Sequence, residues 1–405
     1  MNKSEQLIQQ DQEFGASNYS PIPVVIEKGK GEFLWDVNGQ KYIDMMSAYS
    51  AVSLGHSNKK IIQALMQQAK KVSVTSRAMY NDKLPEFNKI LCEISGLDKC
   101  IPMNSGAEAV ETALKLSRKW AYEVKGVSEN KAIIVAASGN FHGRTLGVIS
   151  LSTEPQYKHN FGPLLPKIKI VNYSDIEDLR KTFQTYGNDI ACFILEPIQG
   201  EAGIIVPSSG YLKEVRKLCD EYNVLMVVDE IQTGLGRTGK LFCHQHENIL
   251  PDLLILGKAL GGGLLPVSAV IGKKEVLGLF KPGDHGSTFG GNSLSCAVAL
   301  EALSQINQVE FLNNVQELGN YLKEELIKNI GTSKIVKEIR GKGLFIGVEF
   351  YEDVDVKGLI KKLLKHGIIT KETHEKVVRL APPLMISKKS LDKAIKIITK
   401  IVHTY

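Results

Sequence analysis

A single lysine, Lys258, interrupts an apolar stretch that is otherwise typical of a protein core. The stretch reads LLILGKALGGGLLPVSAV, and three consecutive glycines follow at 261–263. A charged lysine is costly to bury, so such a residue is paired, shifted toward its neutral form or covalently engaged. A neutral amine is a nucleophile that forms Schiff bases with carbonyl compounds. Lys258 therefore indicates covalent chemistry on a carbonyl group.

Asp229 ends an apolar run and is the first candidate partner for this lysine. The runs at 132–137, 191–196, 224–230 and 252–256 are mostly continuous rather than alternating. Continuous apolar runs are typical of buried, largely parallel strands. Ligand sites in such sheets lie beyond the carboxyl ends of the strands. Asp229 is therefore expected at the edge of a ligand site.

The pair Asp229 and Glu230, followed by GLGRTGKL, also resembles part of a P-loop ATPase. A P-loop needs Ser or Thr directly after its lysine, and it precedes the acidic strand. Here Leu241 follows Lys240, and the glycine-rich loop comes after the acidic strand. These departures argue against an ATPase.

Ser105 stands three residues before Glu108, which is the spacing of a capping box at a helix start. Alone, this pattern indicates only a well-capped helix over 106–122. The free N–H groups of a first helical turn also bind phosphate, and Gly106 permits its close approach. A phosphate site, a carboxylate for a pyridinium nitrogen and a nucleophilic lysine together specify pyridoxal phosphate.

Periodicity along the chain predicts an α/β protein. From about residue 55 to 305, apolar runs alternate with helical patterns, as in βαβ units. After residue 308 the sequence pattern changes to Lys/Glu-rich helical segments around short strands. We therefore expect an N-terminal segment with a small hairpin at 1–49, a large cofactor-binding domain at 50–308 and a small α+β domain at 309–405.

Composition argues against several classes of partner. The net charge of +6 is small and dispersed, so no nucleic-acid footprint is expected. The six cysteines lack CxxC spacing, which favours intracellular thiols over a disulfide framework. The cluster CHQH at 243–246 has no partner cluster with metal-site spacing, so no metal is expected. Without a signal peptide or a long apolar run, we expect a cytoplasmic protein that does not contact membranes.

Several ordered motifs resemble those of the class III aminotransferases, which are pyridoxal-phosphate enzymes of fold type I. These motifs are VVDEIQTGLGRTGK, LLILGKALGGGLLPVSAV and HGSTFGGN, and the resemblance extends from NYSPIPVVIEKG to VVRLAPPL. It implies a mostly parallel seven-stranded central sheet with helices on both faces. It also implies pyridoxal 5'-phosphate as the cofactor and a homodimer with active sites at the subunit interface.

The resemblance also implies roles for individual residues. Lys258 would form the Schiff base with the cofactor and move the substrate proton, while Asp229 would keep the pyridine nitrogen protonated. The other implied cofactor contacts are Ser105, Gly106 and Ala107 at the phosphate, Gln232 near the phenolic oxygen, Phe141 and Ile231 on the two ring faces, and Thr288 at the phosphate of the other subunit.

Substrate choice within this family rests on a few further positions. Tyr49, in MMSAYSAVSLGH, is typical of the members that use ornithine, and Tyr19 matches the same substrate site. Arg144 is similar to an arginine that clamps a substrate carboxylate through its bidentate fork. Arg379 resembles a second carboxylate clamp, and Glu201 resembles the residue that gates it.

The resemblance thus implies transfer of the δ-amino group of L-ornithine to 2-oxoglutarate with ping-pong kinetics. The products would be glutamate and glutamate 5-semialdehyde, which cyclises to 1-pyrroline-5-carboxylate. Acetylornithine or 4-aminobutyrate transamination is the nearest alternative, because His142 in FHGR is frequent in acetylornithine enzymes. We interpret His142 as a packing or supporting residue. A glutamate-1-semialdehyde aminomutase and a cofactor-binding protein without turnover are further alternatives.

Overall fold

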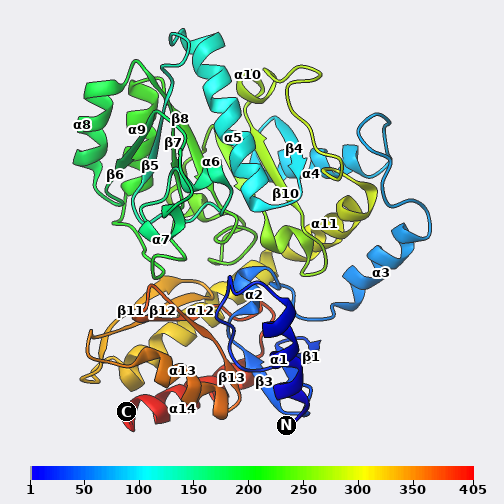
Figure 1. Ribbon diagram of the computed structural model, residues 1–405, viewed down its shortest axis with the longest axis vertical. Coiled ribbons are helices and arrows are strands. Elements are labelled where there is room, and N and C mark those ends of the chain that lie inside the picture. Colours follow the sequence, from blue (N-terminus) through cyan, green and yellow to red (C-terminus); the bar gives the residue numbers. More distant parts are fainter. Residues whose placement is uncertain (1) are drawn as a thin grey trace.

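A seven-stranded sheet in the order β4-β10-β9-β8-β7-β5-β6 organises the upper half of the molecule in Figure 1. The computed structural model describes residues 2–405. Strand β10 pairs antiparallel with β4 and β9, and the other four pairings are parallel, which confirms the expected mostly parallel sheet. The strands are β4 (Lys99–Met103), β5 (Ile133–Ala137), β6 (Ile168–Val171), β7 (Ile190–Leu195), β8 (Leu225–Asp229), β9 (Leu253–Leu256) and β10 (Ser268–Gly272).

Helices cover both faces of this sheet, as its continuous apolar strands require. In β5, Ile134 packs in the cluster formed with α5, whereas its neighbour Ile133 packs on the opposite face with α8 and α9. A third cluster joins β9 and β10 to α3, α4 and α11. These helices are α3 (Lys59–Ala69), α4 (Leu84–Ser95), α5 (Gly106–Trp120), α8 (Ile176–Tyr186), α9 (Tyr211–Glu221) and α11 (Ser293–Ile306).

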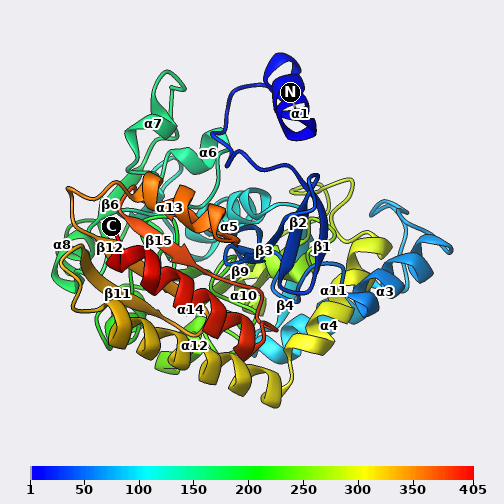
Figure 2. The same ribbon diagram turned by 90° about the horizontal axis from the view of Figure 1, so that it is seen from below.

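A four-stranded antiparallel sheet, β11-β12-β15-β14, lies in the lower half of Figure 1. On one face, Ile346 and Val348 of β12 enter a core with three helices that lie at the front of Figure 2. On the other face, Gly347 lies against Gly203 and Ile204. These two residues belong to the part of the chain that contains the seven-stranded sheet, called the large unit below, whereas the part with the four-stranded sheet β11-β12-β15-β14 is called the small unit. The elements are β11 (Val336–Lys342), β12 (Phe345–Phe350), β14 (Lys371–Thr373), β15 (Val377–Leu380), α12 (Val309–Ile330), α13 (Val356–Lys365) and α14 (Lys388–His403).

The N-terminal segment packs with the C-terminal part of the chain. A hairpin turns around Asn38 and Gly39, and the short strand β13 from the C-terminal part pairs in parallel with its second strand. The remaining elements are α1 (Lys3–Phe14), β1 (Ile26–Lys30), β2 (Phe33–Asp36), β3 (Lys41–Asp44), α2 (Ser47–Ser50), α6 (Leu146–Ile149), α7 (Pro155–Lys158), α10 (Lys274–Leu277), β13 (Ile368–Ile369), a π-helical turn at Ala121–Lys125, and 3₁₀ turns at Cys243–Glu247 and Lys258–Gly261. Across residues 2–405, no helix combines the length and apolar character needed to cross a membrane.

Arg237 is completely buried and links these three parts of the chain. Its Nη1 donates to the carbonyl oxygens of Leu344 and Pro382, at 2.9 and 2.6 Å. Its Nη2 donates to the hydroxyls of Ser47 and Ser53, at 3.2 and 3.1 Å. Burial lowers the pKa of the guanidinium to about 9. Arg237 therefore holds the N-terminal segment and the C-terminal strands against the large unit.

Gly319 of α12 provides a test of how the small unit is packed. A Cβ at this position would lie 2.3 Å from the carbonyl carbon of Gly343, in the turn between β11 and β12. Helix propensity alone favours alanine over glycine by about 1 kcal/mol, but overpacking costs about 1–3 kcal/mol. We expect Gly319→Ala to lower the melting temperature, whereas Asn320→Ala at the exposed next position should not. A higher melting temperature for Gly319→Ala would contradict this close packing.

Candidate active site

A pocket of about 190 Å³ lies where the carboxyl ends of the central strands meet the start of α5. Larger cavities occur elsewhere, including one of about 800 Å³ beside β4, but that cavity contains none of the predicted cofactor-binding residues. The small pocket brings together seven of them: Gly106, Ala107, Phe141, Asp229, Ile231, Gln232 and Lys258. It is therefore the candidate active site.

Lys258 lies two residues after the end of β9 and enters this pocket from a strained backbone. Its φ is 45°, a value uncommon for any residue other than glycine. Such strain persists where the surrounding structure fixes it, often at active sites. Desolvation lowers the pKa of the Lys258 amine, although the nearby carboxylates of Glu201 and Asp229 oppose this shift. The amine is therefore displaced toward its neutral, nucleophilic form.

Among the glycines after Lys258, Gly262 has a clear structural requirement. Its φ is +60°, and a Cβ there would lie 2.9 Å from Ile61 of α3. Glycine adopts this left-handed conformation without steric cost. Gly262 therefore allows the chain to turn tightly against α3 just beyond the lysine.

Asp229 is buried at the end of β8 and is held by two hydrogen bonds. Its Oδ2 lies 2.7 Å from Nδ1 of His142, and its Oδ1 accepts the backbone N–H of Ile231 at 3.0 Å. Burial acts to lower the pKa of His142, but the hydrogen bond and charge of Asp229, with the charge of Glu196, raise it overall. His142 therefore supports the Asp229 carboxylate, and this contact fixes the direction of the carboxylate.

Glu230, the next residue, is turned away from the pocket. Its Oε1 accepts the backbone N–H of His244 at 2.8 Å and lies 2.7 Å from the ring Nδ1 of the same histidine. This contact accounts for one histidine of the CHQH segment. In residues 2–405, no group of three His, Cys, Asp or Glu side chains is arranged to hold a metal ion.

Glu196 is a pocket residue that the sequence analysis missed. It follows β7 just as Asp229 ends β8, so the same strand-end criterion would have found it. Its Oε2 accepts the backbone N–H of Phe141 at 3.0 Å, which positions the segment that carries Phe141 and His142. Burial raises the pKa of the Glu196 carboxyl to about 7, against the opposing charge of His142. Gly143, Ile198 and Thr233 also line the pocket and were not predicted.

Helix α5 presents its N-terminus to the pocket, and the predicted capping box is confirmed. Ser105 Oγ accepts the N–H of Glu108 at 3.2 Å, and Glu108 Oε2 accepts the N–H of Ser105 at 2.6 Å. The N–H groups of Gly106 and Ala107 in the first turn have no intrahelical acceptor, and the helix dipole is positive there. A Cβ at Gly106 would lie 2.8 Å from Cδ1 of Ile231. Glycine at position 106 therefore avoids a clash with Ile231 at the start of the helix.

Several polar atoms in the pocket fit a bound polar ring. Gln232 Nε2, Thr233 Oγ1 and His142 Nε2 are buried and lack a hydrogen-bond partner among the residues described. Buried polar groups are normally hydrogen bonded. Together with Lys258, Asp229 and the helix start, they provide what a pyridine nitrogen, a carbonyl and a phosphate require. The residues present therefore fit pyridoxal phosphate.

On the substrate side, Arg379 of β15 forms an ion pair with Glu201. Arg379 Nη2 lies 2.9 Å from Glu201 Oε2, and only 2% of the arginine side chain is exposed. Neither Nη atom makes a well-aligned hydrogen bond among the described residues, so the fork retains donor capacity. Burial acts to raise the pKa of Glu201, but the adjacent positive charge of Arg379 lowers it overall. The Glu201 carboxylate is therefore favoured in its ionised form beside Arg379.

Tyr49 lies over this ion pair, with its ring centroid 5.2 Å from the guanidinium carbon of Arg379. Its backbone belongs to a left-handed turn, because φ lies between 43° and 72° throughout residues 47–50. Each non-glycine residue in this conformation costs roughly 1–2 kcal/mol. Asp44 Oδ1 accepts the N–H of Ser47 at 2.8 Å, and Ser47 Oγ donates to the Ala381 carbonyl at 2.7 Å. These bonds, with those of the buried Arg237, hold Tyr49 in place.

Arg144 lies at the exposed rim of the site. Its guanidinium carbon is 3.4 Å from the ring centroid of Tyr157 and 5.5 Å from that of Phe141. A guanidinium stacked on aromatic rings in this way is restrained without losing its hydrogen-bond donors. Its charge also helps to lower the pKa of Glu201. Arg144 is therefore placed to meet an anion that enters from solvent.

Two predicted residues lie farther out. Tyr19 is 74% exposed and follows α1, but its phenol is near enough to contribute to the raised pKa of Tyr49, which burial raises most. Thr288 is exposed and does not line the pocket of its own chain. It belongs to a loop whose Ser287 Oγ accepts a hydrogen bond from Asn104 at 2.9 Å.

Comparison with known proteins identifies the class of this chain. The profile of the family described as Aminotransferase class-III matches residues 14–402. The chain belongs to the class-III aminotransferases, and it is a pyridoxal-phosphate-dependent enzyme.

Individual relatives are similar over the whole chain. The ornithine aminotransferase of Bacillus subtilis (strain 168) is 50% identical over 403 residues, which cover 100% of this chain and 98% of that one. The ornithine aminotransferase structure from Toxoplasma gondii ME49 has a TM-score of 0.97 and 41% identity, covering 100% and 96%. The acetylornithine aminotransferase structure from Elizabethkingia anophelis has a TM-score of 0.91 and 43% identity, covering 100% of each chain.

The close approach of Gly106 and Ile231 predicts how cofactor affinity responds to one methyl group. Overpacking costs about 1–3 kcal/mol, so we expect Gly106→Ala to raise the Kd for pyridoxal phosphate by about tenfold or more. Titration of the apoenzyme, followed by absorbance, measures this Kd. The double variant Gly106→Ala/Ile231→Val lacks the Cδ1 atom and should regain most of the affinity. A Kd for Gly106→Ala equal to that of the wild type would contradict this account.

Proposed function

We propose that this aminotransferase takes the δ-amino group of L-ornithine and passes it to 2-oxoglutarate. The products are glutamate and glutamate 5-semialdehyde, which cyclises to 1-pyrroline-5-carboxylate. The observation that carries the proposal is the Glu201–Arg379 ion pair beneath Tyr49, because it lets one pocket serve two substrates of different charge. Full-length relatives at about 50% identity, which are ornithine aminotransferases, support the same substrate.

The cofactor side of the pocket serves proton transfer. Bound pyridoxal phosphate supplies an electrophilic carbonyl for the amino group and a ring that accepts carbanion electrons. Asp229, which His142 fixes in place, would pair with the pyridine nitrogen of the bound cofactor and favour its protonated form. The Nζ atom of Lys258, displaced toward its neutral form by desolvation, removes the proton from the δ-carbon of ornithine. The same Nζ atom would hold that proton until it is returned.

The substrate side selects which amino group reaches Lys258. While Glu201 neutralises Arg379, no free cation beside the lysine attracts the α-carboxylate of ornithine. That carboxylate binds instead to Arg144 at the rim, with Tyr49 and Tyr19 beside the α-amino end. The δ-amino group then lies nearest Lys258.

The second substrate, 2-oxoglutarate, has two carboxylates and no amino group. Its α-carboxylate displaces Glu201 and takes up the free donors of Arg379 in a bidentate pair. Its other carboxylate binds Arg144. A change of partner at Arg379 thus adapts the site to the second half of a ping-pong reaction.

We also propose that the enzyme is a cytoplasmic homodimer. The exposure of Thr288, outside the pocket of its own chain, supports a role at the phosphate site of the other subunit. All six cysteines are unpaired within residues 2–405, which supports a reducing compartment.

Acetylornithine transamination is the second candidate, supported by the similarity to the Elizabethkingia anophelis structure. The FHGR motif that favours it includes His142. This histidine bonds Asp229, and Asp229 acts on the cofactor rather than on the substrate side chain. His142 is therefore compatible with either amino donor, and Tyr49 favours ornithine.

Replacing Tyr49 tests the choice of donor. We expect Tyr49→Ile to lower kcat/KM for ornithine by about tenfold to a hundredfold, the range for losing a hydrogen bond to a charged group. Single-turnover reduction of the cofactor, followed by absorbance, measures each half-reaction separately. Tyr49→Phe separates the loss of the hydroxyl from the loss of the ring. Unchanged ornithine turnover in Tyr49→Ile, or wild-type enzyme that reacts far faster with acetylornithine, would refute the proposal.

A further inference from the structure

We propose that Arg340, a residue outside the pocket, positions the Glu201 carboxylate over Arg379 and thereby sets the preference between the two substrates. This inference rests on the proposed two-substrate function. Arg340 touches neither the pocket lining nor Arg379, so it is a positioning residue that acts through the loop carrying Glu201.

Arg340 and Arg379 belong to the same row of the small sheet. Arg340 of β11 is the register partner of Gly347 on β12, and Gly347 is in turn the partner of Arg379 on β15. Adjacent strands lie about 4.8 Å apart, so the two arginines stand roughly 10 Å apart on one face. Gly347 between them has no side chain, and a Cβ there would lie 3.2 Å from Cβ of Ile204. The glycine leaves room for the Glu201 loop to lie between the two guanidinium groups.

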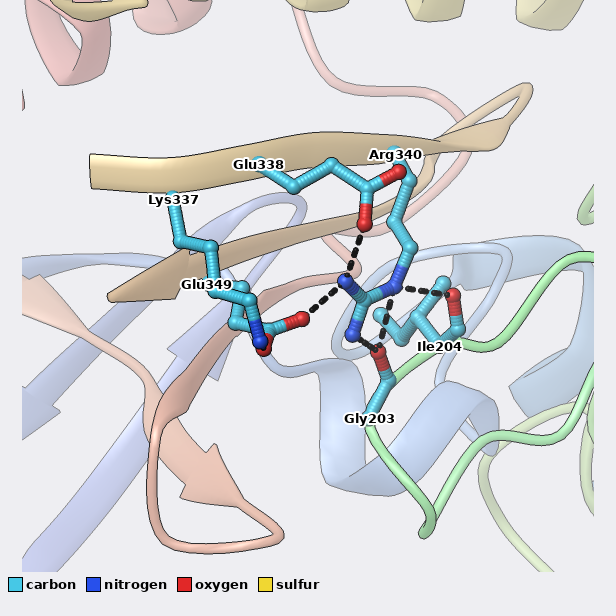
Figure 3. Close-up of polar contacts among 6 residues, drawn as sticks. All are labelled: Gly203, Ile204, Lys337, Glu338, Arg340 and Glu349. Carbon is cyan, nitrogen blue, oxygen red and sulfur yellow. Dashed lines mark hydrogen bonds and ion pairs between the residues drawn. The ribbon is translucent and has the colours of Figure 1, made fainter. Parts of the chain in front are cut away.

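Each guanidinium holds a different part of that loop. Arg379 pairs with the Glu201 carboxylate, as described above. Arg340 donates from Nε to the carbonyl oxygens of Gly203 and Ile204, both at 3.1 Å, and from Nη2 to Gly203 at 2.7 Å. Figure 3 shows the Arg340 guanidinium between these carbonyls and two carboxylates of the small sheet.

The loop requires this restraint because its backbone is strained. Gly203 has φ of +110°, and Ile204 has φ of +54°. A positive φ at a β-branched residue is a genuine outlier. Such a conformation persists only when its surroundings over-determine it. Relaxation of this strain would reorient the carbonyl groups of Gly203 and Ile204. Arg340 donates hydrogen bonds to both of these carbonyl oxygens.

The charge of Arg340 is balanced on the side away from the loop. Its Nη1 donates to Glu338 at 2.7 Å and also pairs with Glu349, which Lys337 contacts at 2.6 Å. These carboxylates offset the cost of burying the positive charge of Arg340, a residue that is only 9% exposed. The planar fork thus serves the carboxylates and the carbonyls at once, which a lysine cannot reproduce.

A second restraint fixes the backbone of Glu201 itself. Thr373 Oγ1, from β14, donates to the Glu201 carbonyl at 2.6 Å. With its backbone held by Thr373 and the following residues by Arg340, Glu201 exchanges partners by rotating its side chain. Loosening the Arg340 contacts therefore weakens the pairing of Glu201 with Arg379 and frees Arg379 for substrate carboxylates.

Arg340→Lys tests this role, because it keeps the charge but removes the fork. We expect kcat/KM for ornithine to fall about tenfold relative to kcat/KM for glutamate, the size of losing one hydrogen bond to a charged group. We also expect the KM for glutamate to fall, because Arg379 is less occupied. Arg216→Lys is the matched control: Arg216 is another largely buried arginine in ion pairs, with Asp252 and Asp220, and it does not line the pocket. It should lower the melting temperature without changing the ratio.

Combining Arg340→Lys with Glu201→Gln in one double variant tests whether Arg340 changes the substrate ratio through Glu201. If Arg340 acts through Glu201, adding Arg340→Lys to Glu201→Gln should shift the ratio no further. The inference is overturned if Arg340→Lys slows both half-reactions equally, as the control would, or if its shift persists in the Glu201→Gln background. Failure of the wild type to use ornithine would overturn the proposed function instead. In that case the KM for glutamate still tests Arg340: a fall supports its role, and no change overturns it.

Discussion

The ion pair between Arg379 and Glu201 is the interaction around which the substrate side of this enzyme is built. A cation that is 2% exposed needs a partner, because an unpaired buried charge is strongly destabilising. When the partner is a side chain on a loop, a substrate carboxylate is able to replace it. In the proposed reaction, the same arginine is therefore hidden from ornithine and available to 2-oxoglutarate.

The two halves of the pocket come from different parts of the chain. The mostly parallel sheet positions the cofactor side, since Asp229 ends β8 and Lys258 lies just beyond the neighbouring strand β9. The substrate side combines Tyr49 from the N-terminal segment with Arg379 from the small antiparallel sheet. The completely buried Arg237 hydrogen bonds to both of these regions. In the proposed function, substrate choice thus depends on how the outer parts of the chain pack against the cofactor site at the end of the large sheet.

Local patterns in the sequence predict much of the cofactor side. Continuous apolar runs correspond to β5, β7, β8 and β9, and the capping box at Ser105 is present. These features depend on residues that are close together in the chain, so they can be predicted without knowledge of the three-dimensional fold. Glu196 ends the apolar run 191–196 just as Asp229 ends its own strand, so the same local pattern also predicts Glu196.

The substrate side is less predictable because its contacts are non-local or conformationally unusual. The left-handed turn at residues 47–50 contains neither Gly nor Asn, which usually indicate a positive φ. Arg340 donates hydrogen bonds to backbone carbonyls that lie 137 and 136 positions away in the sequence. Because every residue has a backbone carbonyl, the residue types do not indicate which ones Arg340 contacts. The resemblance to a family predicts roles for Arg379 and Glu201, but the strain in the loop that carries Glu201 becomes visible only in the structure.

The most direct test of this account follows the nitrogen atom. L-ornithine labelled with nitrogen-15 at the δ-amino group, or separately at the α-amino group, is incubated with the holoenzyme and 2-oxoglutarate, and the products are analysed by mass spectrometry. Because Glu201 masks Arg379 while ornithine binds, the account predicts that the δ label appears in glutamate and the α label stays in the cyclic product. Transfer of the α label to glutamate would contradict it.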